Sequence, residues 1–412
     1  MTTKSVAVQR GRWNWRANAL LLGYLLATVV LTVLVASGTV SRWLPLHTFL
    51  LGAATNAILV WSWHFATTLL HPKRSFAALR TPVLVTANVA IVGLLIGVSR
   101  HESAVVVVGA AVLGLAVVAQ GAAVLAMSLS AQSSRFIVTV WFYLAALAFL
   151  LIGIAFGAVL AVGTSQHWYA RLLVAHLHAN VFGFVALTVV GTELGLWPMV
   201  LRTRIVAGAE NALQRAAPTC FAGLALGVAG SVADSRVITA LGLVGFIVGI
   251  AQSLVPFTVT AARRAPRTPA SWMLTAATVW LLAALATDLA IVVRHAHAAS
   301  WAGQLDDSVP WIVAGFVVQV FLGASTYLLP VVLGGGPTAG RRSARILDFG
   351  APARIAGFNV GVGLLAFRLR GSLAVAGWCL VDLAVIGFVV LAATAIVAQL
   401  LSDRDAAARP QP

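Results

Sequence analysis

The sequence predicts an all-α membrane protein with about twelve transmembrane helices. Hydrophobic residues make up 60% of its 412 residues and charged residues only 9%, whereas a soluble domain carries about 25% charged residues. Runs such as 17–37 and 136–162 are almost wholly apolar and reach the length of about 20 residues that crosses a bilayer. The loops between such runs are too short to fold alone, so we expect one polytopic membrane domain over 1–412.

Each predicted span is an apolar run that ends at a charged, glycine-containing or proline-containing loop. The first follows the segment MTTKSVAVQRGRWNWR, and it is longer than the core of about 7–15 residues in a cleaved signal, so we expect a retained signal anchor. The eleventh is the shortest. In order, the spans are 17–37, 46–70, 81–99, 103–127, 136–162, 171–200, 216–233, 236–260, 270–293, 308–334, 353–369 and 372–401.

The net charge of +16 would fit a nucleic-acid-binding protein, but the distribution of the charges favours a membrane topology. With twelve spans both termini share a side, and the opposite side carries only seven of the 27 Lys and Arg residues: Arg42, Arg100, Arg171, Arg236, Arg294, Arg368 and Arg370. Cytoplasmic loops are enriched in Lys and Arg. We therefore expect cytoplasmic termini in the plasma (inner) membrane of a bacterium, a bilayer as partner, and no nucleic acid.

A weak internal repeat divides the predicted spans into three units of four. His47-x4-Gly52 in the second span matches His178-x4-Gly183 in the sixth, and Gly183 matches Gly323 in the tenth. Ala-Gln pairs at 119–120 and 251–252 agree with the same period. Internal repeats are common in membrane folds. The pattern predicts units of about 1–135, 136–267 and 268–412, arranged as three four-helix arcs with pseudo-threefold symmetry.

Three histidines lie inside apolar spans, in the predicted outer half. They are His47 in WLPLHTFLLG and the pair His176 and His178 in VAHLHANVFG. An imidazole in hydrocarbon is costly unless it is bonded, and histidine is a common ligand of metals and heme iron. Positions i and i+2 point about 200° apart on a helix. One of the pair therefore faces a site while the other bonds a neighbouring helix, or the helix is irregular there. Gly52 and Gly183 would allow close approach by a helix or by a flat cofactor.

Further polar residues extend this set of candidates. His295 and His297 lie at the outer end of the ninth span, where a His-x-His pair can bind copper or zinc. Intramembrane acids are candidates for proton steps, for cation sites or for pairing with an arginine, and spacing would allow Asp288 to pair with Arg294 at the end of the same span. The candidates for a proton or polar path are Asp382, Asp288, Glu193, Gln319 and Asn180.

This pattern resembles the heme–copper oxidase subunit I superfamily, which has twelve helices in three arcs. The lines HTFLLGAATNAILVWSWHF and HLHANVFGFVALTVVGT also resemble oxidase-like membrane regions found with multicopper oxidases and, more distantly, NnrS-type heme proteins. The resemblance implies a heme b ligand at His47 and a copper ligand at His176 or His178. The seventh span lacks the family's His-His pair, the tenth has no histidine, and Asn180 and Phe182 stand where a tyrosine is expected.

The resemblance therefore implies an oxidase-like scaffold with a reduced site, not an oxygen-reducing proton pump. We expect heme, copper or both in the outer half, with a role in redox chemistry, copper handling or the response to nitrogen oxides. If the chain is an enzyme, it is an oxidoreductase, and its partner is a redox protein or multicopper oxidase on the outer side. Two alternatives stay open: a transporter or metal permease with a histidine-lined path, and a cofactor-free assembly protein.

Overall fold

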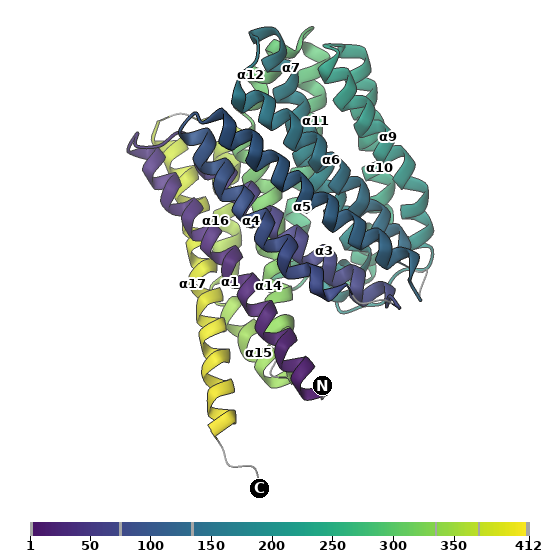
Figure 1. The fold of residues 1–412 in the computed structure, drawn as a ribbon, viewed down its shortest axis with the longest axis vertical. Coiled ribbons are helices and arrows are strands. Elements are labelled where there is room, and N and C mark those ends of the chain that lie inside the picture. Colours follow the sequence, from purple (N-terminus) through teal and green to yellow (C-terminus); the bar gives the residue numbers. More distant parts are fainter. Residues whose placement is uncertain (1–2, 74–75, 133–135, 334–335, 370, 409–412) are drawn as a thin grey trace. The chain divides into compact units, whose positions relative to one another are not determined.

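The computed structural model describes residues 3–73, 76–132, 136–333, 336–369 and 371–408, and all regular structure in these ranges is helical (Figure 1). Arg370, one of the predicted outer charges, lies outside them. Within the described ranges ten helices are long and apolar enough to cross a membrane, or eleven if one bent pair is a single span. The chain is therefore a multi-pass membrane protein. The orientation of its termini stays a prediction.

The helices match the predicted spans closely, because each span is a long uninterrupted apolar run. The second, sixth and tenth spans are each built from several helical segments in series. In chain order, the helices of the first ten spans are α1 (Thr3–Ala36), α2 (Trp43–His47) with η1 (Thr48–Ala54) and α3 (Thr55–Leu70), α4 (Ala77–Ser99), α5 (Ser103–Leu129), α6 (Ile137–Val162), α7 (Gln166–Leu177) with η2 (His178–Ala186) and α8 (Leu187–Val200), α9 (Ala209–Val232), α10 (Arg236–Arg263), α11 (Pro269–Arg294), and α13 (Val309–Ile312) with η3 (Val313–Val318) and α14 (Gln319–Leu333).

The structure departs from the predicted twelve spans at α9 and near the C-terminus. The seventh span coincides with α9, but this helix begins with the polar run AENALQR and is not among the ten apolar candidates. The eleventh span is the short α16 (Ala351–Ala366), which follows α15 (Gly336–Leu347) at a bend of 44°, and the twelfth is α17 (Ser372–Ala408). Neither α15 nor α12 (Ala298–Asp306) was predicted, because both are short and amphipathic.

The described chain packs as two compact units. Unit 1 comprises Met1–Ala57, Arg267–Ala277 and Ala314–Pro412, and unit 2 comprises Ile58–Pro266 and Thr278–Val313. In unit 1, α16 packs along α17; in unit 2, α9 packs along α10 (Figure 1). These boundaries describe packing and differ from the predicted thirds of the sequence. The three-unit repeat therefore stays a prediction.

The α9–α10 pair is joined by glycines that bring the two backbones into direct contact. A Cβ atom on Gly242 of α10 would overlap the backbone of Gly227 on α9, and one on Gly249 would lie 2.6 Å from the Cys220 nitrogen. Small residues allow this close approach, which replaces side-chain interdigitation in membrane helix packing. The close pair fixes the end of α9, where Ser231 and Asp234 lie.

Candidate functional site

Three π-helical segments recur in the second, sixth and tenth spans. η1 begins at Thr48, η2 at His178 and η3 at Val313, so the starts are 130 (48 to 178) and 135 (178 to 313) residues apart. A π-helix inserts an extra residue into the helical turn and is frequently found at functional sites. His47 immediately precedes η1, His178 is the first residue of η2, and Gln319 immediately follows η3. The predicted candidates thus lie at the edges of these irregular segments.

A glycine in or just after each π-helical segment packs against the preceding long helix. A Cβ on Gly52 would overlap the Tyr24 ring of α1, one on Gly183 would overlap the Phe149 side chain of α6, and one on Gly323 would lie 2.9 Å from the Met273 Cβ of α11. The sequence predicts that Gly52 and Gly183 leave room either for a neighbouring helix or for a flat cofactor. In the structure, aromatic side chains of neighbouring helices occupy both positions.

His178 lies in a fully buried polar cluster of unit 2. Its Nε2 lies 2.7 Å from the Asp288 carboxylate on α11, and both side chains are fully buried. Its Nδ1 lies 3.3 Å from the Ser231 hydroxyl on α9, which also lies 2.9 Å from the Gly227 carbonyl oxygen. The pairing of Asp288 with Arg294 that spacing would allow is not the one in the structure, because the Asp288 carboxylate is buried against His178.

The donors and acceptors in this cluster indicate where the protons of Ser231, His178 and Asp288 lie. The Gly227 carbonyl can only accept, so the single Ser231 proton goes to it at the shorter of the two distances. Ser231 then accepts a proton from His178 Nδ1. The short contact to Asp288 needs a further proton, shared between His178 Nε2 and the carboxylate. With that proton the pair carries no net charge, which a low-dielectric interior favours; the other Asp288 oxygen, Oδ1, is buried without a hydrogen-bond partner among the described residues.

His176 points to a different helix from His178, as the 200° separation of i and i+2 residues predicts. Its Nδ1 donates to the Gly153 carbonyl oxygen of α6 at 2.9 Å. A Cβ on Gly157, one turn further along α6, would lie 2.8 Å from the His176 ring. Asn180 donates to the His176 carbonyl at 2.8 Å and covers Gly153. The ring therefore lies against a glycine-lined face of α6.

His47 is held in a similar way in unit 1. Its Nδ1 donates to the Trp43 carbonyl at 3.0 Å, and its ring stacks on the Trp43 ring at a centroid distance of 4.3 Å. Since a carbonyl only accepts, the contacts of both His47 and His176 require the proton on Nδ1 and leave the lone pair on Nε2; the Asn180 amide nitrogen also lies 3.2 Å from Nδ1 of His176. A histidine that ligates a metal commonly has its other ring nitrogen bonded to a carbonyl in this manner.

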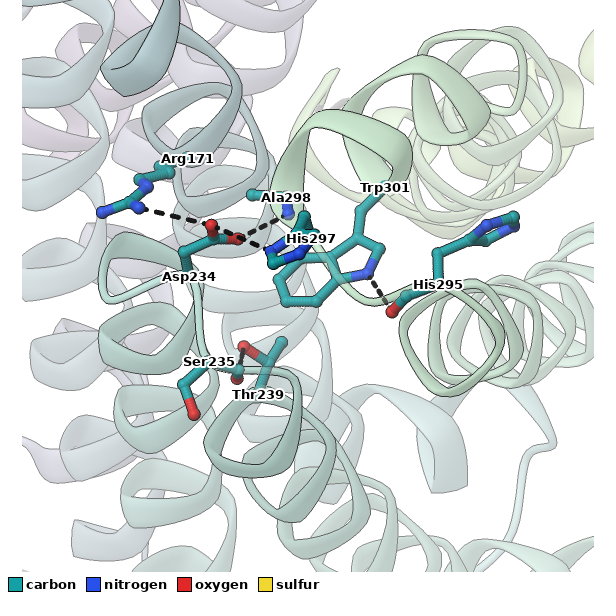
Figure 2. Close-up of polar contacts among 8 residues, drawn as sticks. All are labelled: Arg171, Asp234, Ser235, Thr239, His295, His297, Ala298 and Trp301. Atoms are coloured by element: carbon teal, nitrogen blue, oxygen red, sulfur yellow. Dashed lines mark hydrogen bonds and ion pairs between the residues drawn. The ribbon is translucent and has the colours of Figure 1, made fainter.

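A second polar cluster joins three helix ends of unit 2 around Asp234 (Figure 2). Asp234 lies between α9 and α10 with a left-handed φ of 55°, a conformation that Asp adopts more readily than most residues. Its carboxylate accepts from the Ala298 amide at 2.6 Å and pairs with Arg171 at 3.2 Å. It also lies 3.4 Å from Nδ1 of the exposed His297. Asp234 thus caps α12 from another element.

The His295–His297 pair does not converge in this structure. Figure 2 shows the His297 ring directed at Asp234 and the His295 ring directed away from it. The His295 carbonyl accepts from the indole of Trp301, which is fully buried in α12. Within the described residues, no three His, Cys, Asp or Glu side chains gather as a metal site.

Replacing Asp234 by alanine is expected to lower the free energy of unfolding by about 1–3 kcal/mol, because the α12 cap and the Arg171 pair are lost. Alanine also fits the left-handed backbone poorly. Asp234→Asn is the matched control, since asparagine tolerates this backbone and keeps an acceptor for the Ala298 amide. Thermal unfolding in detergent measures the stability of both variants, and the rate of tryptic cleavage after Arg294 measures how well the segment before α12 is held. Equal stability of the alanine variant and the native chain would contradict this role.

The other predicted polar residues lie apart from these clusters. Glu193 is buried in α8, and Asp382 is half-buried in α17. Gln319 is fully buried, and neither its amide oxygen nor its nitrogen has a hydrogen-bond partner among the described residues. Such an unsatisfied pair costs free energy and calls for an explanation. Its place directly after η3 marks it as a further candidate.

Sequence reasoning missed Ser231 and Asp234. Ser231 is one hydroxyl in an apolar helix, and nothing in its neighbourhood distinguishes it from a serine bonded only to its own helix. Asp234 could have been found, because an acid between two apolar runs can cap a neighbouring helix end.

Neither the known protein-family models nor the curated proteins include a match to this chain.

Proposed function

We propose that this chain is an oxidase-like membrane protein that binds heme b or copper through histidines at its π-helical segments. The supporting observation is the recurrence of η1, η2 and η3 in the second, sixth and tenth spans; in the second and sixth of these the resemblance implies ligands. Bound heme or copper would supply one-electron redox chemistry. The role would lie in redox reactions, copper handling or the response to nitrogen oxides in a bacterial plasma membrane.

The histidines fit this role to different degrees. His47 and His176 each have Nδ1 on a backbone carbonyl, so Nε2 is the atom with the lone pair that a metal needs. His178 fits poorly as a ligand, because Asp288 and Ser231 take up its two ring nitrogens. We therefore assign His47 of unit 1 and His176 of unit 2, each considered by itself, as candidate ligands and His178 as a proton-holding residue. The outer face would then receive a redox or multicopper oxidase partner.

A visible spectrum with metal analysis of the detergent-purified chain tests this function. We expect a Soret band or stoichiometric copper, and we expect His176→Gln in unit 2 or His47→Gln in unit 1, each tested by itself, to lower the heme or copper content. His101→Gln is the matched control, because His101 lies in the turn between α4 and α5, outside both histidine environments. A native chain with neither heme nor stoichiometric copper would overturn the proposal.

The His178–Asp288 pair favours a second candidate, a proton-linked transporter. Release of the shared proton would leave one net negative charge in a fully buried site, which is costly unless a cation replaces it. Proteoliposomes with an internal pH dye and an imposed copper or zinc gradient test this function. We expect Asp288→Asn to abolish metal-driven proton movement if the chain is such a transporter. No proton movement by the native chain would remove this candidate.

A further inference from the structure

The unpredicted helix α15 presents one strongly basic face. Its sequence is GPTAGRRSARIL. Arg341, Arg342 and Arg345 are exposed, whereas Ser343 and Leu347 are buried. Arg345 lies four residues after Arg341 and three after Arg342, so it neighbours both on the helix surface, while Ser343 and Leu347 are buried against the protein. A helix of this kind is typical of the membrane–water interface.

Contacts within unit 1 hold α15 in place. α15 packs against α14 and α17. The Arg354 side chain of α16 donates to the carbonyl oxygens of Leu347 at 2.6 Å and Phe349 at 3.2 Å. The bond to Leu347 satisfies a carbonyl at the C-terminal end of α15, which has no partner within the helix, and the bond to Phe349 holds the turn that follows it. Arg342 donates to the Ser402 hydroxyl near the end of α17 at 2.9 Å. The basic face is therefore carried by a braced element and not by a loose loop.

An exposed aromatic residue follows the basic face. Phe349 is the second residue after α15 and is 75% exposed, beside the exposed carboxylate of Asp348. An exposed phenyl ring next to guanidinium groups suits the boundary between acyl chains and headgroups, where aromatic residues anchor interfacial helices. A soluble polyanion would match the arginines but would leave the phenyl ring in water.

We propose that α15 and Phe349 form a binding surface for anionic phospholipid headgroups. The guanidinium groups match phosphate oxygens in charge and in fork geometry, and basic segments beside membrane helices are attracted to anionic leaflets. The arginine-rich side of the chain is the predicted cytoplasmic side, where such lipids concentrate. This inference does not depend on the proposed cofactor.

Native mass spectrometry of the detergent-solubilised full chain tests the proposal, with phosphatidylglycerol and phosphatidylcholine as probes. We expect preferential binding of phosphatidylglycerol, and we expect the triple change Arg341→Gln, Arg342→Gln and Arg345→Gln to weaken it about tenfold or more. The matched control replaces Arg263, Arg264 and Arg267 by glutamine. These three are also exposed and lie on the same predicted side, in or just after the end of α10, and we expect at most a small change.

Three results would overturn the proposal. The first is unchanged phosphatidylglycerol binding by the α15 triple variant. The second is an equal loss in the control variant, which would indicate a general effect of net charge. The third is competition by inorganic phosphate as strong as by the lipid, which would indicate a phosphate site without a lipid contact. Replacement of the α15 arginines by lysine should retain most of the preference, and circular dichroism checks that each variant is folded.

Discussion

Replacing Asp288 by alanine is expected to lower the free energy of unfolding by about 3–5 kcal/mol, because removal of one partner leaves the other buried and uncompensated. His178 and Asp288 are both fully buried and 2.7 Å apart. Without the carboxylate, His178 Nε2 loses its partner inside the bundle, where water does not replace it. The shift of the thermal unfolding midpoint in detergent measures this cost.

Two further variants separate the charge from the hydrogen bond. Asp288→Asn keeps an acceptor for the His178 ring, so we expect a smaller loss than with alanine. A double change of His178 and Asp288 to leucine removes both polar groups. We expect it to lower the free energy of unfolding by less than the sum of His178→Leu and Asp288→Leu, because apolar replacement of a buried pair is often nearly neutral. Additive effects in this cycle would contradict direct pairing.

The membrane spans were predictable because they depend on composition over long windows. Twenty apolar residues leave few alternatives to a helix in a bilayer, and α4, α5 and α6 begin and end within a few residues of prediction. α12 and α15 were not found, because each has only one apolar face and depends on packing against other helices. Their sequences, read alone, are those of polar loops.

The site was predictable in its residues but not in its pairings. His47, His176, His178 and Asp288 were all singled out, since ionisable groups in apolar spans need a partner. The partner of Asp288, however, lies 110 residues away in the sequence, while the nearer Arg294 was the only basic residue that spacing could offer. The π-helical segments left no recognisable pattern, because an extra residue in a turn is decided by packing and not by residue type.

Replacing Gly242 by alanine is expected to be the most damaging single methyl addition in unit 2. Its Cβ would overlap the backbone of Gly227, and a backbone cannot rotate away as a flexible side chain can. The helices would have to separate, which we expect to cost about 3 kcal/mol or more, at or above the upper end of ordinary overpacking. Thermal unfolding in detergent and the yield of monodisperse protein measure the effect.

The same interface supplies the control. A Cβ on Gly227 would lie 3.7 Å from its nearest neighbours, an ordinary van der Waals contact, although Gly227 faces Gly242 directly. Gly227→Ala should therefore be tolerated, and Gly93→Ala, which meets nothing within 4 Å, should be neutral or slightly stabilising because alanine favours the helix. Equal damage from Gly227→Ala and Gly242→Ala would mean that α9 and α10 meet in a different register. The Ser231–His178 contact, which depends on the position of α9, would then also need revision.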